Sequence, residues 1–428
     1  MWYTCGMKRR LSQRAYLNGD QRRLAARLFG SCRFVYNAYL YEATRQYNEK
    51  GRTDFASVEK VVLTAAKRVP ETAWLAELPS VPLQQSSQHA RRAYMDYFKS
   101  LRGERKGAKL GKPKFKKKRK SRDAASFTKA SRFRIRVDGC SKWGFVRLPG
   151  FGEVKFHVSQ DIDWESVSSI TLVGNPDGSH TMSFVYEYVS DKTPAPEGSV
   201  AGIDLGLKSL AYVIRVDEHD NVSKFSEPQR AHFRRAQRKL RSAQKSLSRK
   251  QEGSRNYEKQ RKEVARIHAN VAARRKDQLD KFTHKVSRET QTVALETLSL
   301  NGIGRTRLAK SMYDSGLGSL CRMLEYKTAD RGGQVIRVGR WTPTTQPCSV
   351  CGHKGIGKLP LSVREWTCVG CGTELHRDYN AALNILFAAG LAATLKDCGA
   401  SVRRISVAGR NRQGSSHPPN LSTVGGRA

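Results

Sequence analysis

Cys348-Ser349-Val350-Cys351 and Cys368-Val369-Gly370-Cys371 are separated by sixteen residues, and Asp378 follows seven residues after the last cysteine. Two Cys-x2-Cys pairs at this separation fit a zinc ribbon. Four thiolates bind one zinc ion tetrahedrally and leave no open position, so we expect Cys348, Cys351, Cys368 and Cys371 to hold a structural zinc. Gly352 and Gly372 follow the two pairs, where a tight knuckle needs a positive φ.

Three carboxylates stand where strands or helices begin or end. Arg377-Asp378-Tyr379-Asn380-Ala381-Ala382-Leu383-Asn384-Ile385 indicates a helix that opens on Asp378, whereas Asp204 and Glu296 interrupt or end apolar strands at 200–206 and 292–296. Burying a lone carboxylate is costly, so such residues usually have a partner or a metal. The ordinary alternative for each is a residue that caps a loop or pairs with a lysine.

The three carboxylates together suggest metal chemistry. Carboxylates from two strands and a helix can hold two magnesium ions about 4 Å apart, which activate water and stabilise the leaving oxygen in phosphodiester hydrolysis. Magnesium suits an all-oxygen site better than zinc. We therefore expect Asp204, Glu296 and Asp378 to form a magnesium-dependent catalytic site.

The charge of the chain identifies the class of partner. Lysine and arginine number 78 and aspartate and glutamate 38, which gives a net charge of +40. Such an excess favours a polyanion, most plausibly nucleic acid, over a cationic surface that binds nothing specific. The five cysteines outside the ribbon are scattered singly, which indicates a reducing compartment.

Two segments concentrate the positive charge. The helical pattern over 228–288 carries 20 lysines and arginines against five acidic residues. The second segment is a run of cations that we expect to contact the nucleic-acid backbone: Lys112, Lys114, Lys116, Lys117, Lys118, Arg119 and Lys120. Phosphate contacts of this kind give affinity without sequence information. The alternatives are a solvated helix face or a sorting signal. Phe115 and Tyr36 could stack on bases, although core packing is favoured for Tyr36.

No targeting or membrane segment is evident. The chain lacks a run of eighteen apolar residues, and its first residues lack the apolar centre of a signal peptide. We expect a cytoplasmic protein, in the cytosol or on the nucleoid, with no membrane partner.

The hydrophobic pattern changes period along the chain. Helical spacing covers about 20–51, with Asp20 as the expected N-cap, then about 58–67 and 83–101. Residues 127–189 alternate as strands of a small antiparallel barrel or sheet, whereas Met1–Gln13 makes a poor strand. Strands are expected at 200–206, 210–214, 292–296 and 334–338, with a helical hairpin turning near Gly253 and a helix over 317–330. The composition after residue 396 predicts disorder, most clearly over 409–428.

Several motifs, in order along the chain, resemble one family. They are Gly202-Ile203-Asp204-Leu205-Gly206-Leu207-Lys208, Leu295-Glu296-Thr297-Leu298, the two cysteine knuckles within 345–352 and 366–372, and Arg377–Ile385. Over roughly residues 14–395 the chain resembles TnpB, a transposon-encoded RNA-guided DNA endonuclease related to type V CRISPR effectors. Gly111–Lys118 and Cys32–Asn37 give weaker support.

The resemblance implies an α+β multidomain fold. An RNase H-like RuvC nuclease domain, with a mixed sheet and helices, would comprise 198–340 and 375–395, with Asp204, Glu296 and Asp378 as metal ligands. A zinc ribbon would be inserted at 341–374. A wedge-like β-barrel domain would comprise 1–24 and 113–190, a helical recognition lobe 25–112, and a basic tail 396–428.

The resemblance also implies the partners. They are a guide RNA from the transposon end and double-stranded target DNA beside a short adjacent motif, with the protein a monomer on its RNA. Phe55, Ser80, Gln84 and Thr128 would lie near that motif, and Arg377 would help hold the scissile phosphate. Two departures stand out: His376-Arg377-Asp378 replaces the family's frequent Asp-Arg-Asp, and Ala15-Tyr16-Leu17-Asn18 lacks the usual proline.

Other functions remain open at this point. A nuclease-dead relative would use the same RNA to occupy DNA and repress transcription, but it would lack one or more of the three carboxylates. A transposase would join strands through a 3′-hydroxyl rather than water. A zinc-ribbon RNA-binding protein without catalysis would leave the carboxylates in the strands unexplained.

Overall fold

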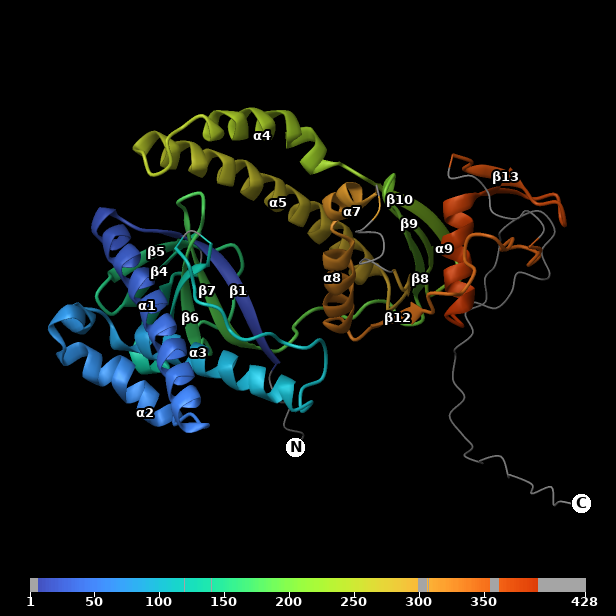
Figure 1. Cartoon of the computed structure of the whole chain (residues 1–428). Coiled ribbons are helices and arrows are strands. Elements are labelled where there is room, and N and C mark those ends of the chain that lie inside the picture. The colour runs from blue at the N-terminus through green and yellow to red at the C-terminus, as the bar shows by residue number, and fades with distance from the viewer. Residues whose placement is uncertain are drawn as a thin grey trace, which may run out of the picture. The chain divides into compact units, whose positions relative to one another are not determined.

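The computed structural model describes residues 7–118, 120–139, 141–298, 306, 308–354 and 362–391 (Figure 1). The predictions for Arg119 and for the tail after residue 396 lie outside these residues. The chain forms two compact units: the described residues up to Val189 with Ala243–Arg266, and Ser190–Ser242 with the residues from Ile267 onward. Within the described residues, no helix is long and apolar enough to cross a membrane.

The first unit contains an open antiparallel sheet, a half-barrel whose strand order is β2-β6-β7-β1-β5-β4-β3. This agrees with the predicted barrel or sheet. The strands are β1 (Met7–Tyr16), β2 (Asp123–Thr128), β3 (Arg134–Val137), β4 (Trp143–Leu148), β5 (Gly152–His157), β6 (Ser169–Gly174) and β7 (His180–Tyr188).

The expectation of a poor strand at the N-terminus was wrong. β1 lies in the middle of the sheet and pairs with β7 from Met7↔Tyr188 to Ala15↔His180. Its inward positions include Gln13, which is buried and hydrogen-bonded to Ser159, so the apolar alternation is broken by a polar side chain with a distant partner. That partner is 146 residues away, beyond the reach of a local pattern.

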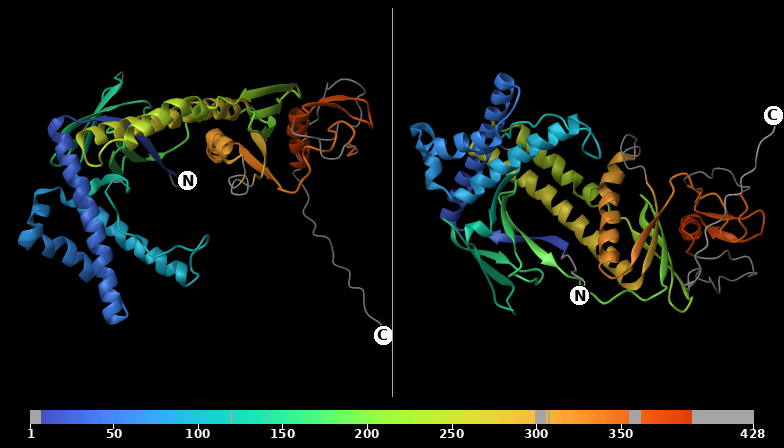
Figure 2. Two further views of the ribbon diagram at one scale, coloured as in Figure 1. Left: turned by 45° about the horizontal axis from the view of Figure 1, so that its top comes forward. Right: turned by 90° about the horizontal axis from the view of Figure 1, so that it is seen from below.

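The predicted helices of this unit are present. They are α1 (Gly19–Lys50), α2 (Phe55–Glu59) and α3 (Ser80–Leu101). π and 3-10 turns over 60–77 join α2 to α3, and α1 packs against α3 (Figure 2). Gly51 ends α1 at φ 65° as expected. The cap prediction was wrong, because Asn18 caps the helix: its side chain accepts from the Gln21 N–H at 2.8 Å. Helices and sheet share one core, which includes Tyr39, Tyr94 and Phe127.

The second unit contains a mixed sheet of strand order β10-β9-β8-β11-β12. Its strands are β8 (Val200–Leu205), β9 (Ser209–Val216), β10 (Val222–Pro228), β11 (Thr292–Glu296) and β12 (Gln334–Val338). β8, β11 and β12 run parallel, and β9 and β10 extend the sheet antiparallel. β10 was not predicted, because this exposed edge strand carries mostly polar residues and so lacks apolar alternation.

Helices cover both faces of this sheet. Those that share a core with it are α5 (Arg255–Glu289), α8 (Leu317–Ala329) and α9 (Arg377–Ala388), and the chain also forms α4 (His232–Ser248) and α7 (Ala309–Ser315). α4 and α5 form the predicted hairpin, and Gly253 in the turn between them has φ 88°. Residues of α5 and α8 share a core with one face of β8 and β11, and residues of α9 share a core with the other face (Figure 1).

Candidate active site and zinc ribbon

Asp204 and Glu296 lie at the carboxyl ends of adjacent parallel strands. The register pairs Leu295 with Ile203, so Glu296 follows directly beside Asp204. Side chains alternate between faces along a strand, which places Asp204 with Gly202 and Glu296 with Ala294. Ala294 is fully buried in the core formed with α9. The two carboxylates therefore lie on the face that α9 covers.

Gly202 determines how closely α9 approaches that face. A Cβ atom on Gly202 would lie 2.1 Å from the carbonyl oxygen of Ala382 and 2.7 Å from Cγ of Leu386. Asp378 precedes Ala382 by one helical turn, and Asp204 follows Gly202 by two residues on the same face of the strand. The contact at Gly202 thus brings the start of α9, with Asp378, to the end of β8. The three predicted carboxylates share one site.

We expect Gly202→Ala to weaken both the fold and the site. Its methyl group would meet the helix backbone, so α9 must move away, and overpacking of this kind costs about 1–3 kcal/mol. The melting temperature, measured by thermal unfolding, should therefore fall. Gly139→Ala is the matched control, because nothing lies within 4 Å of its added Cβ. A Gly202→Ala protein with an unchanged melting temperature would contradict this account of the packing.

The electrostatics of the site show an excess of negative charge. Burial, and then the charges of Asp378 and Glu296, raise the pKa of Asp204 to about 7, although Arg377 and Arg364 offset part of this effect. Burial also raises the pKa of Glu296. Three acidic groups in a poorly solvated site, two of them hard to ionise, fit a site that a divalent cation would neutralise.

Asp204→Asn should stabilise the magnesium-free protein in a pH-dependent way. The raised folded-state pKa means that ionising Asp204 opposes folding, and this penalty grows from about pH 4 to about pH 7 and persists above it. At pH 8 the variant should gain on the order of 2 kcal/mol in urea unfolding, and near pH 4 it should gain almost nothing. Equal unfolding free energies of wild type and variant at pH 8 would contradict the assigned burial.

Arg364 is a site residue that sequence reasoning missed. Its guanidinium Nη1 donates to both carboxylate oxygens of Asp378, at 2.9 and 2.8 Å, and Asp378 is buried at 7% exposure. The backbone N–H of Arg377 also donates to the Arg364 carbonyl at 2.7 Å. Arg364 thus neutralises Asp378 from a position fourteen residues earlier that no local motif marks. The half-buried Arg377 is near enough to Asp204 to affect its pKa.

Two asparagines of α9 bind the segment that leads into the ribbon. The Asn380 side chain accepts from the Ser349 N–H at 2.8 Å and donates to the Pro347 carbonyl at 2.8 Å. The Asn384 side chain donates to the carbonyls of Thr344 and Pro347, both at 2.8 Å. The helix that carries Asp378 is therefore bonded directly to the chain around the first cysteine pair.

The four cysteines converge as the spacing predicts. Their sulfur atoms all lie within 4.8 Å of one another. Among the described residues, no other group of three or more histidine, cysteine, aspartate or glutamate side chains places its ligand atoms this close together. A backbone hydrogen bond of 2.8 Å closes each knuckle: the Gly352 N–H donates to the Cys348 carbonyl, and the Gly372 N–H donates to the Cys368 carbonyl. Both glycines have a positive φ, 74° and 70°. This geometry fits a structural zinc and confirms the predicted knuckle conformation.

An aromatic cluster borders the carboxylates. Tyr212 lies opposite Asp204 in the β8–β9 register, and its ring is 5.2 Å from that of His376 and 5.1 Å from that of Tyr379. Residues paired across an antiparallel ladder share a face, so these rings stand beside the acidic site. They border one side of the site.

Comparisons with known proteins agree with this geometry. A family model described as "Probable transposase" (OrfB_IS605) matches residues 183–307, and a "Cas12f1-like, TNB domain" model matches 318–385. A "Putative RNA-guided DNA endonuclease" of Streptomyces pristinaespiralis is 36% identical over 98% of this chain and 98% of its own length. The chain belongs to the TnpB family. The relative named InsQ in Escherichia coli K12, with the same description, is 30% identical over 90% of this chain and 92% of its own length.

Solved structures share the fold of this TnpB-family chain. A Cas12f1–sgRNA–target DNA complex superposes with a TM-score of 0.54 at 14% identity, covering 89% of this chain and 98% of that one. The mini-RNA-guided endonuclease Cas_phi3 gives 0.54 at 8% identity, covering 90% and 92%. A model described as a helix-turn-helix domain matches residues 7–52, which here form strand β1 and the single helix α1.

The remaining predicted site residues of this TnpB-family chain lie in the first unit. Ser80 and Gln84, one turn apart in α3, line a groove with Lys60 and Lys67. The other two predicted motif residues lie elsewhere: Phe55 packs against Tyr94 with ring centroids 6.4 Å apart, and Thr128 ends β2. The structure therefore brings two of the four together. A role in motif reading stays a prediction for all four.

The predicted backbone-contacting cations are not equivalent. Lys112, Lys114, Lys117 and Lys120 line a hollow beside α1, and Lys118 lines a second one with Arg33 and Asp123. Lys116 instead turns inward, with Nζ 3.8 Å from the centroid of the Tyr36 ring. Tyr36 is buried at 9% exposure, in agreement with the preference for core packing.

Proposed function

We propose that this TnpB-family chain is an RNA-guided DNA endonuclease that hydrolyses phosphodiesters at the site formed by Asp204, Glu296 and Asp378. The observation that carries the proposal is the placement of these three carboxylates on one face of a mixed sheet, at two strand ends and a helix start. RNA binding without catalysis does not account for three clustered carboxylates, whose burial and mutual repulsion raise the pKa of Asp204 to about 7.

The carboxylate oxygens would hold magnesium. Magnesium bound there would activate water and balance the charge that develops on the phosphate. Two arginines complete the site. Arg377, at the first position of α9, would contact the scissile phosphate, and Arg364 forms an ion pair with Asp378. Tyr212 and Tyr379, whose rings contact each other, would limit water on one side of the site.

The cationic segments would bind the nucleic acids. A guide RNA and a double-stranded DNA target both present closely spaced phosphates, which suit the net charge of +40. In this proposal the helices of 25–112 act as a recognition lobe, the half-barrel as a wedge domain, residues 198–340 and 375–395 as the nuclease domain, and 341–374 as the ribbon. We place one protein molecule on each guide RNA, in the cytoplasm.

Cleavage of a plasmid library tests the proposal. The target would match the guide region of the RNA that co-purifies with the protein, flanked by randomised bases, in magnesium buffer. Cuts beside one enriched flanking motif would establish the guided nuclease. Target retention without cuts by the wild-type protein would favour the repressor, and joined rather than hydrolysed strands would favour the transposase. RNA binding with neither retention nor cuts would leave the zinc-ribbon RNA-binding protein.

A further inference from the structure

The segment that follows the helical lobe is fastened to α1 and α3. The Asn37 side chain donates to the Lys116 carbonyl at 2.9 Å and accepts from the Lys116 N–H at 2.8 Å. The Leu110 N–H donates to the hydroxyl of Ser100 at 2.9 Å. These contacts hold residues 110–117 in a defined path and fix which side chains point inward.

That path reverses the usual burial preference of two neighbouring residues. Lys116 points inward over Tyr36, and burial lowers the pKa of its amine. Phe115 points outward and is 54% exposed, and Tyr41 on α1 is 64% exposed. Leaving a phenyl ring in water forfeits roughly 1.5–3 kcal/mol of burial free energy. A lone exposed ring is ordinary, so the case for a ligand depends on whether the two rings share one cavity.

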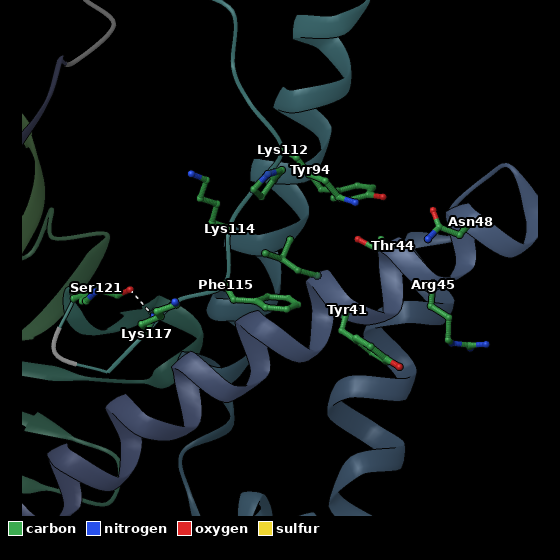
Figure 3. Close-up of a pocket in the computed structure, with 13 residues that line it drawn as sticks. Tyr41, Thr44, Arg45, Asn48, Tyr94, Lys112, Lys114, Phe115, Lys117 and Ser121 are labelled. Carbon is green, nitrogen blue, oxygen red and sulfur yellow. Dashed lines mark hydrogen bonds between the residues drawn. The ribbon is translucent and has the colours of Figure 1, made fainter.

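Phe115 and Tyr41 line one cavity of about 820 Å³ in the first unit. In Figure 3 the Phe115 ring extends from the segment of residues 110–117 toward α1, where Tyr41 and Thr44 lie. Lys112, Lys114, Lys117 and Lys120 also line it. Within the described residues, no carboxylate pairs with these four lysines. The cavity therefore combines flat apolar rings with uncompensated positive charge.

We propose that this cavity binds an unpaired nucleotide of the guide RNA, with its base stacked on Phe115 and Tyr41 and its phosphates on the surrounding lysines. Exposed aromatics among cations recognise single-stranded nucleic acid, because paired bases stack inside a duplex and offer no free face. This inference rests on the proposed function, which supplies the guide RNA.

Two polar side chains in the cavity favour RNA over DNA. Thr44 and Asn48 project from α1 beside Tyr41 (Figure 3), and among the described residues their side chains make no hydrogen bond. A ribose 2′-hydroxyl both donates and accepts, so it can pair with either group, whereas deoxyribose cannot. A segment of the guide fits this combination better than displaced DNA.

Photocrosslinking of the full-length complex tests the assignment. The co-purifying RNA would be transcribed with 5-iodouridine, bound to the protein, irradiated and mapped by mass spectrometry. We expect crosslinks at Phe115 or Tyr41, competed by a ten-nucleotide oligouridylate more strongly than by oligothymidylate. Crosslinks confined to other sites would overturn the proposal, and equal competition would overturn the assignment to RNA.

Affinity measurements with matched variants complete the test. Phe115→Ala should raise the Kd for the same RNA about 5- to 150-fold, the equivalent of one stacked base, while Phe115→Trp should keep wild-type affinity. Tyr313→Ala, which removes a ring that is 65% exposed in the second unit, should change nothing. If Phe115→Ala leaves the Kd unchanged and guided cutting is intact, this inference is contradicted and the proposed function is not. If Phe115 crosslinks to the RNA but the protein cuts no guided target, the proposed function is contradicted and this inference is not.

Discussion

Asp204→Asn should abolish cleavage of a guide-matched plasmid, lowering the rate at least about a thousandfold. Asp204 is central to the acidic cluster, since its pKa responds to both Asp378 and Glu296. In the proposed site, losing one of the three carboxylates would remove a metal ligand, and a loss of about 4 kcal/mol of transition-state stabilisation corresponds to three orders of magnitude. Binding of guide RNA should be unchanged, because the cationic segments lie elsewhere in the sequence.

The control for this prediction is Asp220→Asn. Asp220 lies in the turn between β9 and β10. This turn is at the end of β9 opposite to the one that pairs with Asp204, and asparagine tolerates the φ of 61° at this position. The single-turnover cleavage rate and the Kd for RNA would be measured for both variants. Cleavage by Asp204→Asn at the wild-type rate would show that the chemistry lies outside the proposed site.

The second large effect concerns the zinc ribbon. Cys348→Ser should lose the zinc and reduce guided cleavage at least about a hundredfold, since a structural zinc contributes on the order of 10 kcal/mol to local folding. The loss reaches the proposed active site through hydrogen bonds: Asn380 and Asn384 bond to the chain around Cys348, and Arg364 in the ribbon bonds to Asp378.

Zinc content per protein and cleavage rate should fall together in Cys348→Ser. Cys351→His offers a matched variant, because Cys351 is exposed and three cysteines with one histidine also bind zinc. It should keep the zinc and most of the activity. Full activity in a zinc-free Cys348→Ser protein would show that the ribbon does not position Asp378.

Much of the candidate site could be predicted because its signals are local. A carboxylate inside an apolar strand, as at Asp204, or at the start of a helical period, as at Asp378, is visible in a few residues of sequence. The same holds for the cysteine knuckles, whose glycines adopt the expected positive φ. Family motifs then joined these separate signals into one nuclease fold, and the comparisons confirm that fold and family.

What escaped prediction depends on partners far along the chain or on weak local patterns. Strand β1 is central because it pairs with β7, more than 160 residues later, and its buried Gln13 hides the apolar alternation. Arg364 is one arginine among many until the ribbon folds back onto α9. The inward turn of Lys116 follows from its contacts with Asn37, 79 residues earlier. The domain boundaries and catalytic roles remain predictions.

Exchange of the guide is the most direct test of the central claim. The protein would be assembled with its co-purifying RNA, or with the same RNA carrying a new guide segment, and given two plasmids that match one guide each beside the same flanking motif. We predict that cleavage follows the guide, so that each complex cuts only its matched plasmid and Asp204→Asn cuts neither. Cutting that ignores the guide, or that persists in Asp204→Asn, would contradict an RNA-guided nuclease centred on Asp204, Glu296 and Asp378.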